Sequence, residues 1–228
     1  MEPMASGGDL SCLHVVVPLR TVSGGKLRLG EALDPEERET LIVGMLRHEL
    51  TALGTWRRAT AVHVVSPDPR VPPIVEAAGA RAIRQHGEGL NAGIVQARAI
   101  TVALGATALL VLPGDLPLMD VAALDRLLDA TDAALAAGGG GPVVALVPAD
   151  ARGGTNGLLC SPPGVIEPCF GPSSLECHLL AARKAGASVQ LVVDAVLGFD
   201  LDTPEDLDRL DLGRLTELEA LGSAVLAV

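Results

Sequence analysis

The stretch Ala108–Leu118 reads A-L-L-V-L-P-G-D-L-P-L, an apolar strand followed directly by a turn and an aspartate. A short apolar run bounded by turn residues is typical of a strand buried on both faces, as in a parallel sheet. Near the other end of the chain, Phe199–Leu207 (F-D-L-D-T-P-E-D-L) again places aspartates just before a helix start. Carboxylate oxygens combined with substrate phosphates are the ligands that Mg²⁺ prefers. We therefore expect a Mg²⁺ site formed by Asp115 with Asp200 or Asp202, and phosphate chemistry with a nucleotide.

Strands and helices alternate along the rest of the chain. We expect strands at residues 13–17, 61–66, 80–83, 142–147, 157–159 and 189–193, in addition to the one that opens at residue 108. We expect helices at residues 71–78, 89–104, 120–137 and 174–185, and two more that begin at Asp34 and at Thr203, where Asp206 completes a capping box. This alternation predicts an α/β fold with a mainly parallel, twisted sheet flanked by helices. We expect one domain over residues 12–212, with terminal extensions at 1–11 and 213–228.

The composition excludes several classes of protein. Hydrophobic residues make up 49% of the 228 residues, so the chain has enough apolar surface to fold. A net charge of −11 and an aromatic content of 1% argue against a nucleic-acid partner, which rewards basic surfaces and stacking side chains. We find no apolar run of about 20 residues and no secretory leader, so we expect no membrane association and a cytoplasmic location. The four cysteines form no C-x-x-C pair, so we expect reduced thiols.

The loop after the first strand contains the candidate phosphate contacts. In an open parallel sheet, ligands bind beyond the carboxyl ends of the strands. Gly25, Lys26 and Arg28 lie in this loop, and Lys26 is one of only two lysines in the chain. Backbone N–H groups and a mobile ammonium can both approach a phosphate there. The spacing is neither that of a Walker A loop nor G-x-G-x-x-G, and a solvated surface charge is the alternative interpretation of Lys26.

Two other segments are candidates for holding the base and ribose of a nucleotide. One is the turn that begins at Ser66, and the other is the helix start at Gly89 and Asn91. Both follow expected strands or open a helix, so they lie where nucleotides bind in folds of this class.

A second ligand has candidate contacts in Gly153–Asn156 and Phe170–Ser174. Small residues, hydroxyl groups and a helix N-terminus together suit an anion, here a phosphorylated acid. His178 lies one turn after Ser174 on the same face of the expected helix. Its role stays open between positioning this acceptor and packing in the core.

The motifs K-L-R-L, L-D-P-E-E-R, G-L-N-A-G-I, L-P-G-D-L-P-L, G-G-T-N, F-G-P-S-S-L-E-C-H-L and D-L-D-T-P-E-D-L occur in this order along the chain. With them the chain resembles the CofC family, the guanylyltransferases that begin the side chain of coenzyme F-420, from about Val15 to Leu210. The resemblance implies a nucleotide-diphospho-sugar transferase fold, GT-A-like and Rossmann-like in architecture. It also implies GTP as a substrate, Mg²⁺ as the cofactor, and acceptor contacts on Thr155, Gly171 and Ser174.

The reaction implied by the resemblance joins GMP from GTP to the phosphate of a phosphorylated three-carbon acid, with release of pyrophosphate. Lys26 and Arg28 would offset the negative charge during the transfer. Phosphoenolpyruvate is the favoured acid, and 2-phospho-L-lactate and 3-phosphoglycerate stay open. So do a homodimer and a downstream transferase that takes the product. The alternatives are another cofactor or sugar nucleotidyltransferase and, in a different class, a non-catalytic nucleotide-binding module.

Overall fold

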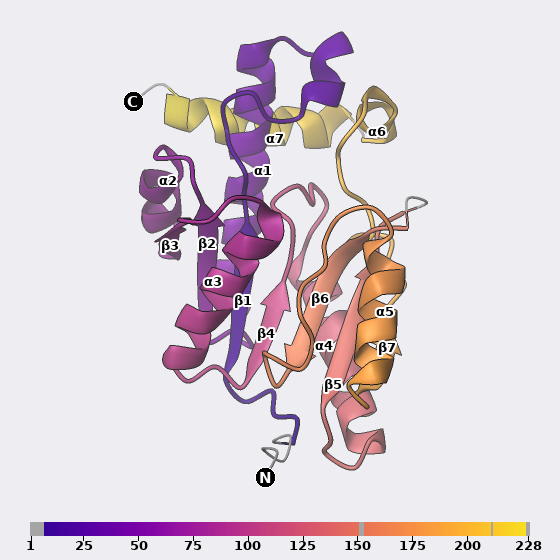
Figure 1. Cartoon of the computed structure of the whole chain (residues 1–228). Coiled ribbons are helices and arrows are strands. Elements are labelled where there is room, and N and C mark those ends of the chain that lie inside the picture. Colours follow the sequence, from indigo (N-terminus) through magenta and orange to yellow (C-terminus); the bar gives the residue numbers. More distant parts are fainter. Residues whose placement is uncertain (1–6, 151–152, 211, 227–228) are drawn as a thin grey trace.

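The computed structural model describes residues 7–150, 153–210 and 212–226. Its centre is a seven-stranded sheet in the order β3-β2-β1-β4-β6-β5-β7 (Figure 1). The strands are β1 (Leu13–Pro18), β2 (Ala61–Ser66), β3 (Arg81–Arg84), β4 (Ala108–Val111), β5 (Val143–Pro148), β6 (Thr155–Ser161) and β7 (Ser188–Leu191). All neighbouring pairs are parallel except those of β6, which runs antiparallel to β4 and β5. The expected α/β fold with a mainly parallel sheet is confirmed, and the sheet is a mixed one.

Helices cover both faces of this sheet (Figure 1). They are α1 (Pro35–Thr55), α2 (Val71–Ala77), α3 (Leu90–Ala103), α4 (Val121–Ala137), α5 (Ser174–Lys184), α6 (Pro204–Arg209) and α7 (Leu212–Leu226), with a 3-10 helix η1 (Leu27–Glu31). The apolar faces of α1, α2 and α4 share one core cluster, and those of α3 and α5 share the other. None of the helices in the described part of the chain has the length and hydrophobicity of a membrane span.

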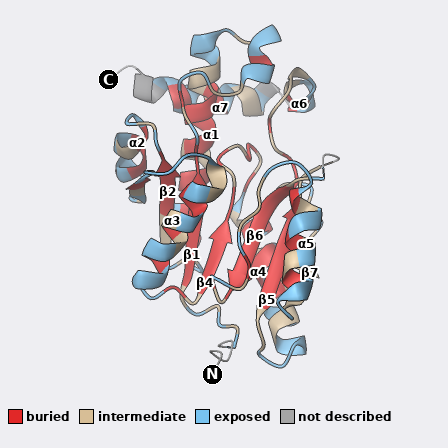
Figure 2. Cartoon of the chain, in the orientation of Figure 1, coloured by how far each residue is buried: buried red, intermediate tan, exposed pale blue. Residues whose placement is uncertain are grey.

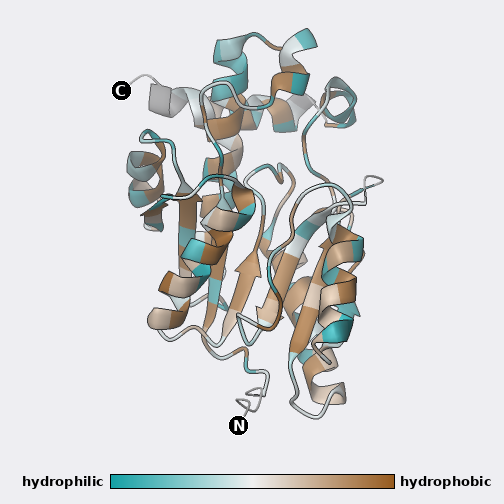
Figure 3. Ribbon diagram, viewed as in Figure 1, coloured by the Kyte–Doolittle hydropathy of each residue, from teal (hydrophilic) through white to brown (hydrophobic). Residues whose placement is uncertain are grey.

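The inner strands are buried because each of their faces supplies one of the two clusters, whereas the edge strands β3 and β7 are partly exposed. In β1, Val15 and Val17 enter the cluster under α1, and Val16 enters the cluster under α3, as the alternation of side chains along a strand requires. Figure 2 shows the inner strands as a buried layer between helices with exposed outer faces, and Figure 3 shows that these strands are strongly hydrophobic.

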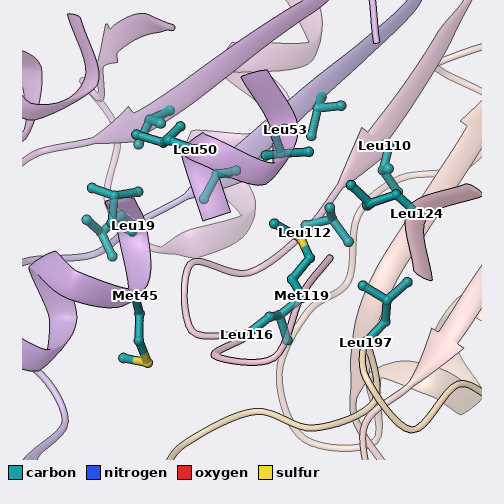
Figure 4. Packing of buried hydrophobic residues seen from close by; sticks show 14 of the residues in the cluster. Leu19, Met45, Leu50, Leu53, Leu110, Leu112, Leu116, Met119, Leu124 and Leu197 are labelled. Carbon is teal, nitrogen blue, oxygen red and sulfur yellow. The ribbon is translucent and has the colours of Figure 1, made fainter. Parts of the chain in front are cut away.

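The turn after β4 is anchored in the core on both sides of its aspartate. Leu112, Leu116 and Met119 are completely buried, and they lie among the side chains of α1 and α4 (Figure 4). Fully burying such a side chain contributes about 1.5–3 kcal/mol. Asp115, between these anchors, is therefore held at the carboxyl edge of the sheet.

The C-terminal helix α7 crosses α1 at backbone contact (Figure 1). A Cβ atom added to Gly44 of α1 would lie 1.9 Å from the carbonyl oxygen of Leu218, and one added to Gly222 of α7 would lie 1.9 Å from that of Thr40. Only glycine permits so close an approach of two helices at these positions. The expected C-terminal extension 213–228 is, in its described part, a helix packed on the domain.

Candidate active site at the carboxyl edge of the sheet

Three charged side chains from distant parts of the chain meet at this edge. Lys26 Nζ lies 2.5 Å from Asp115 Oδ2 and 2.6 Å from Asp202 Oδ1. Burial alone would lower the pKa of Lys26, but the two carboxylates outweigh it and raise the pKa above its usual value. The ammonium is therefore a fixed positive charge between two carboxylates.

The loop that carries Lys26 is tied to the end of β2. Asp68 accepts hydrogen bonds from Thr21 Oγ1 at 3.1 Å and from the backbone N–H of Val22 at 2.8 Å. Burial would raise the pKa of Asp68, but these hydrogen bonds and those from Arg70 lower it below its usual value. Lys26 itself adopts the left-handed backbone conformation, with φ of 51°, just before η1. Asp68 thus fixes the start of the loop, and the turn at Lys26 directs the chain into η1.

Asp115 is held through its neighbours' backbone groups. The N–H of Leu116 donates to Glu49 Oε1 of α1 at 2.8 Å, and the carbonyl of Asp115 accepts from the N–H of Leu201 at 3.1 Å. Among the described residues, Asp115 Oδ1 and Glu49 Oε2 are buried without a hydrogen-bond partner. Asp115 therefore keeps one carboxylate oxygen available for a further ligand.

Glu49 is a site residue that the sequence analysis missed. Its side chain is completely buried, and burial raises the pKa of its carboxyl group well above the usual value. The available signal was its position: it follows Met45 and Leu46 by four and three residues and precedes Leu53 by four, on the apolar face of the helix. An acid on such a face has either a buried partner or a reason to be neutral.

Asp200 and Asp202 have different surroundings. Asp202 contacts Lys26, and its backbone N–H donates to Asp206 Oδ2 at 3.0 Å. Asp206 also accepts from the N–H of Thr203 at 2.9 Å, which confirms its role in the capping box. Asp200 Oδ1 instead accepts from Asn156 Nδ2 at 3.2 Å. Asp202 is thus the member of this pair that shares Lys26 with Asp115.

A cleft of about 490 Å³ opens beside these charges. Its lining includes the loop residues Gly25, Lys26 and Arg28, together with Asp115 and Asp202. A smaller hollow of about 190 Å³, lined by Pro67, Gln85 and Gly89 among others, shares part of this lining. The residues common to both are Pro18, Leu19, Arg20 and Leu90. The two hollows therefore form one continuous depression, and the two aspartates lie in its larger part.

Two of the residues expected to contact the nucleotide have partners in the protein. Asn91 donates from Nδ2 to the carbonyl of Phe170 at 3.0 Å and accepts from the N–H of Phe170 at 2.8 Å. Ser66 is buried, and its hydroxyl accepts from the N–H of Asp68 at 3.1 Å. These side chains hold loops beside the depression, whereas Gly25 and Gly89 line it.

The expected acceptor residues come together at the start of β6 and α5. Ser174 Oγ lies 3.2 Å from Thr155 Oγ1, and Gly171 accepts at its carbonyl from the N–H of Ser174. Asn156, next to Thr155, connects this group to Asp200 and so to the segment that carries Asp202. The two sets of predicted residues therefore share one edge of the sheet.

Two of the four cysteines are joined next to this group. Cys169 and Cys177 form a disulfide with a Cα–Cα separation of 6.5 Å, while Cys12 and Cys160 are free. The expectation of reduced thiols is wrong for this pair, because the turn before α5 brings together two residues that are eight positions apart in sequence. That arrangement is set by the turn and is invisible in the cysteine spacing.

A family model described as "Guanylyl transferase CofC like" matches residues 13–213 of the chain. A phosphoenolpyruvate guanylyltransferase of Rubrobacter xylanophilus is 44% identical over 200 residues, which are 87% of this chain and 93% of that protein. One of Sphaerobacter thermophilus is 40% identical, over 86% and 90% of the two chains. A relative named 3-phospho-D-glycerate guanylyltransferase, from Phenylobacterium zucineum, is 36% identical over 85% and 87%.

Solved structures confirm the fold. A protein described as a nucleotide-diphospho-sugar transferase from Desulfovibrio desulfuricans superposes with a TM-score of 0.71 at 18% identity, covering 93% of this chain and 97% of that one. At that identity the likeness concerns the architecture alone. The family model and the curated relatives, however, extend over nearly the whole domain, and so the chain belongs to the CofC-like guanylyl transferase family.

Proposed function

We propose that this protein transfers GMP from GTP to the phosphate of a phosphorylated three-carbon acid, as the first step in building the side chain of coenzyme F-420. Phosphoenolpyruvate is the favoured acid because the two most identical relatives described above carry that substrate in their names. The observation that supports the proposal most strongly is the meeting of Lys26, Asp115 and Asp202 beside the cleft. One ammonium and two carboxylates carry a net negative charge, so this arrangement suits a polyphosphate that binds together with a divalent cation.

The donor set fits Mg²⁺. Asp115 has a buried oxygen without a hydrogen-bond partner among the described residues, and Asp202 supplies a second hard oxygen beside it. No group of three or more His, Cys, Asp or Glu side chains that could hold a metal occurs in the described part of the chain. Mg²⁺ usually takes only one or two carboxylates and fills its other positions with water and substrate phosphates. Asp115 and Asp202 would therefore hold the ion only together with the nucleotide.

The chemistry needs no nucleophile from the protein. An oxygen of the acid's phosphate attacks the α-phosphorus of GTP; the new P–O bond forms as the bond to the β-phosphate breaks, and pyrophosphate leaves with the electron pair. Bound Mg²⁺ would supply neutralisation of phosphate charge. Lys26 and Arg28 line the cleft, where they offset the charge of the triphosphate. Thr155, Gly171 and Ser174 orient the acid, so that catalysis comes from alignment.

Mass spectrometry of the products tests this proposal. The protein is incubated with GTP, MgCl₂ and an equimolar mixture of phosphoenolpyruvate, 2-phospho-L-lactate and 3-phosphoglycerate. We expect pyrophosphate release and one dominant adduct, that of GMP with phosphoenolpyruvate. A different dominant adduct would show that another of the three acids is the substrate. Binding of GTP without any adduct would instead support a non-catalytic nucleotide-binding module.

A further inference from the structure

Three buried polar side chains form a hydrogen-bonded group beneath the turn that precedes α5. Thr155 is 6% exposed, Ser174 2% and His178 0%. Thr155 Oγ1 lies 3.1 Å from His178 Nδ1 and 3.2 Å from Ser174 Oγ. His178 Nε2 lies 2.9 Å from the backbone nitrogen of Cys169. Each atom in this group has a donor or acceptor role that can be worked out.

The backbone contact fixes the tautomer of His178. A backbone N–H can only donate, so Nε2 must be the acceptor of the hydrogen bond from Cys169. A neutral imidazole carries a single proton, which must then be on Nδ1. Burial lowers the pKa of His178 to about 4, so the ring is neutral near pH 7. His178 Nδ1–H therefore donates to Thr155 Oγ1.

The same accounting leaves the proton of Thr155 available. Its oxygen accepts from His178 and from the hydroxyl of Ser174, which uses both lone pairs. Its O–H can then only donate elsewhere. Ionised phosphate and carboxylate oxygens only accept hydrogen bonds, so a donor with this fixed direction suits a phosphorylated acid.

The position of the imidazole is itself enforced. The ring of Phe170 packs edge-on against it, with centroids 5.0 Å apart and an interplanar angle of 70°. Asn91 holds Phe170 through both backbone groups, as described above. Turning the ring over would replace both nitrogens by carbons, so His178 would lose its hydrogen bonds with Cys169 and with Thr155.

We propose that His178 is a positioning residue that makes the Thr155 hydroxyl a donor to the acid. The proposal rests on the proposed function, since it needs the acid to bind at Thr155. His178 itself touches no substrate atom and acts only through the hydroxyl. It thus differs from a core histidine, whose replacement would change stability without selectively changing the use of the acid.

A matched pair of variants tests whether His178 acts through the Thr155 hydroxyl. His178→Asn places an amide nitrogen near the site of Nδ1, so it can still donate to Thr155 but loses the bond from Cys169. His178→Gln places a carbonyl near the site of Nε2, so it can keep the hydrogen bond from Cys169 but not the one to Thr155. We expect Gln to raise the KM for the acid about tenfold, as loss of one hydrogen bond to a charged group would, and Asn to raise it less. The Kd for GTP should not change in either variant.

A double-mutant cycle distinguishes the action of His178 through the Thr155 hydroxyl from a simple packing role. Thr155→Val should raise the KM for the acid about 10- to 100-fold. If His178 acts through the hydroxyl, adding His178→Gln to Thr155→Val should have no further effect. Effects that multiply in the double variant, or a larger loss in Asn than in Gln, would overturn the role of His178. An unchanged KM in Thr155→Val alone would instead remove the acid from this position, and the placement of the substrate would fail with it.

Discussion

The two ends of the candidate site are built on opposite principles. The end at Lys26, Asp115 and Asp202 is charged and partly open, with side chains that are 12%, 23% and 34% exposed. The end at Thr155 and His178 is neutral and almost completely buried. A charged group can exchange partners when a polyphosphate and a cation arrive, whereas a buried neutral network is costly to rearrange because an unpaired polar group there is penalised. The charged end can therefore rearrange when nucleotide and cation bind, whereas the neutral end keeps a fixed geometry that can discriminate between acids.

The largest effect should come from removing a carboxylate at the charged end. We expect Asp115→Asn to fold normally and to lower kcat by roughly 10³-fold, as the loss of a preorganised electrostatic group does. Pyrophosphate release measures the rate, and a thermal melt checks the fold.

Asp200 offers a matched control, because it lies two residues from Asp202 but contacts Asn156. Asp202→Asn should resemble Asp115→Asn, and Asp200→Asn should lose far less. Equal losses at Asp200 and Asp202 would contradict the assignment of Asp202 to the charged end.

Removing the cation of the charged end should have the next largest effect. Lys26→Met leaves two carboxylates facing each other without a positive charge, so their repulsion is uncompensated. We expect kcat to fall about 10²-fold and the melting temperature to become dependent on MgCl₂ in the absence of nucleotide. Lys26→Arg keeps the charge and is the control. A melting temperature of the Met variant that ignores MgCl₂ would argue against a cation site at these aspartates.

The hydrogen bond between Glu49 and the N–H of Leu116, which holds the turn next to Asp115, can be tested by substitution of Glu49. Glu49→Leu leaves the N–H of Leu116 without its buried acceptor, which should cost about 1–3 kcal/mol of unfolding free energy. Glu49→Gln keeps an oxygen in the same place and should cost much less. Urea unfolding measures both, and kcat should follow the same order because Asp115 adjoins Leu116. Equal stabilities of the two variants would show that this hydrogen bond contributes little.

The same contrast explains how much the sequence could predict. Asp115 is predictable because it follows β4, and a strand's end fixes where its next residues lie without reference to tertiary contacts. Asp200 and Asp202 follow no strand in the structure, and the start of helix α6 is the local signal that marks their position. The choice of Asp202 required its neighbour Lys26, and Glu49 required the turn that it supports. Both depend on contacts between segments far apart in the chain, which a local pattern does not encode.

The packing of helix α7 and the disulfide could not be predicted from the sequence, for related reasons. The tail from residue 212 has mixed apolar and polar residues, and its contact depends on Gly44, a glycine inside α1 that has no local signature. Cys169 and Cys177 become neighbours only through the turn that contains Gly171. By contrast, the resemblance selects Thr155 and Ser174, and their hydroxyl groups are in contact in the structure.

The smallest expected effect is the loss of folding stability at low pH that comes from His178 at the neutral end of the site. The pKa of His178 is about 4 in the folded protein and about 6.5 in an unfolded chain, so the unfolded state binds a proton first as the pH falls. The stability associated with the neutral ring is complete above pH 6.5 and is lost progressively as the pH falls toward 4. Between pH 7 and pH 5 the loss from this one group should be about 1–2 kcal/mol.

His178→Asn isolates this contribution, because asparagine does not titrate and all other groups stay the same. The variant is expected to be less stable than the natural chain at pH 7, where its packing and its bond from Cys169 are missing. The difference between the two should shrink as the pH is lowered to 5, since only the natural chain loses stability by protonating the unfolded imidazole. Urea unfolding at both pH values measures that difference directly. A difference that stays constant would mean that His178 titrates normally in the folded protein, and the Thr155–His178 end of the site would then carry a charge at mildly acid pH.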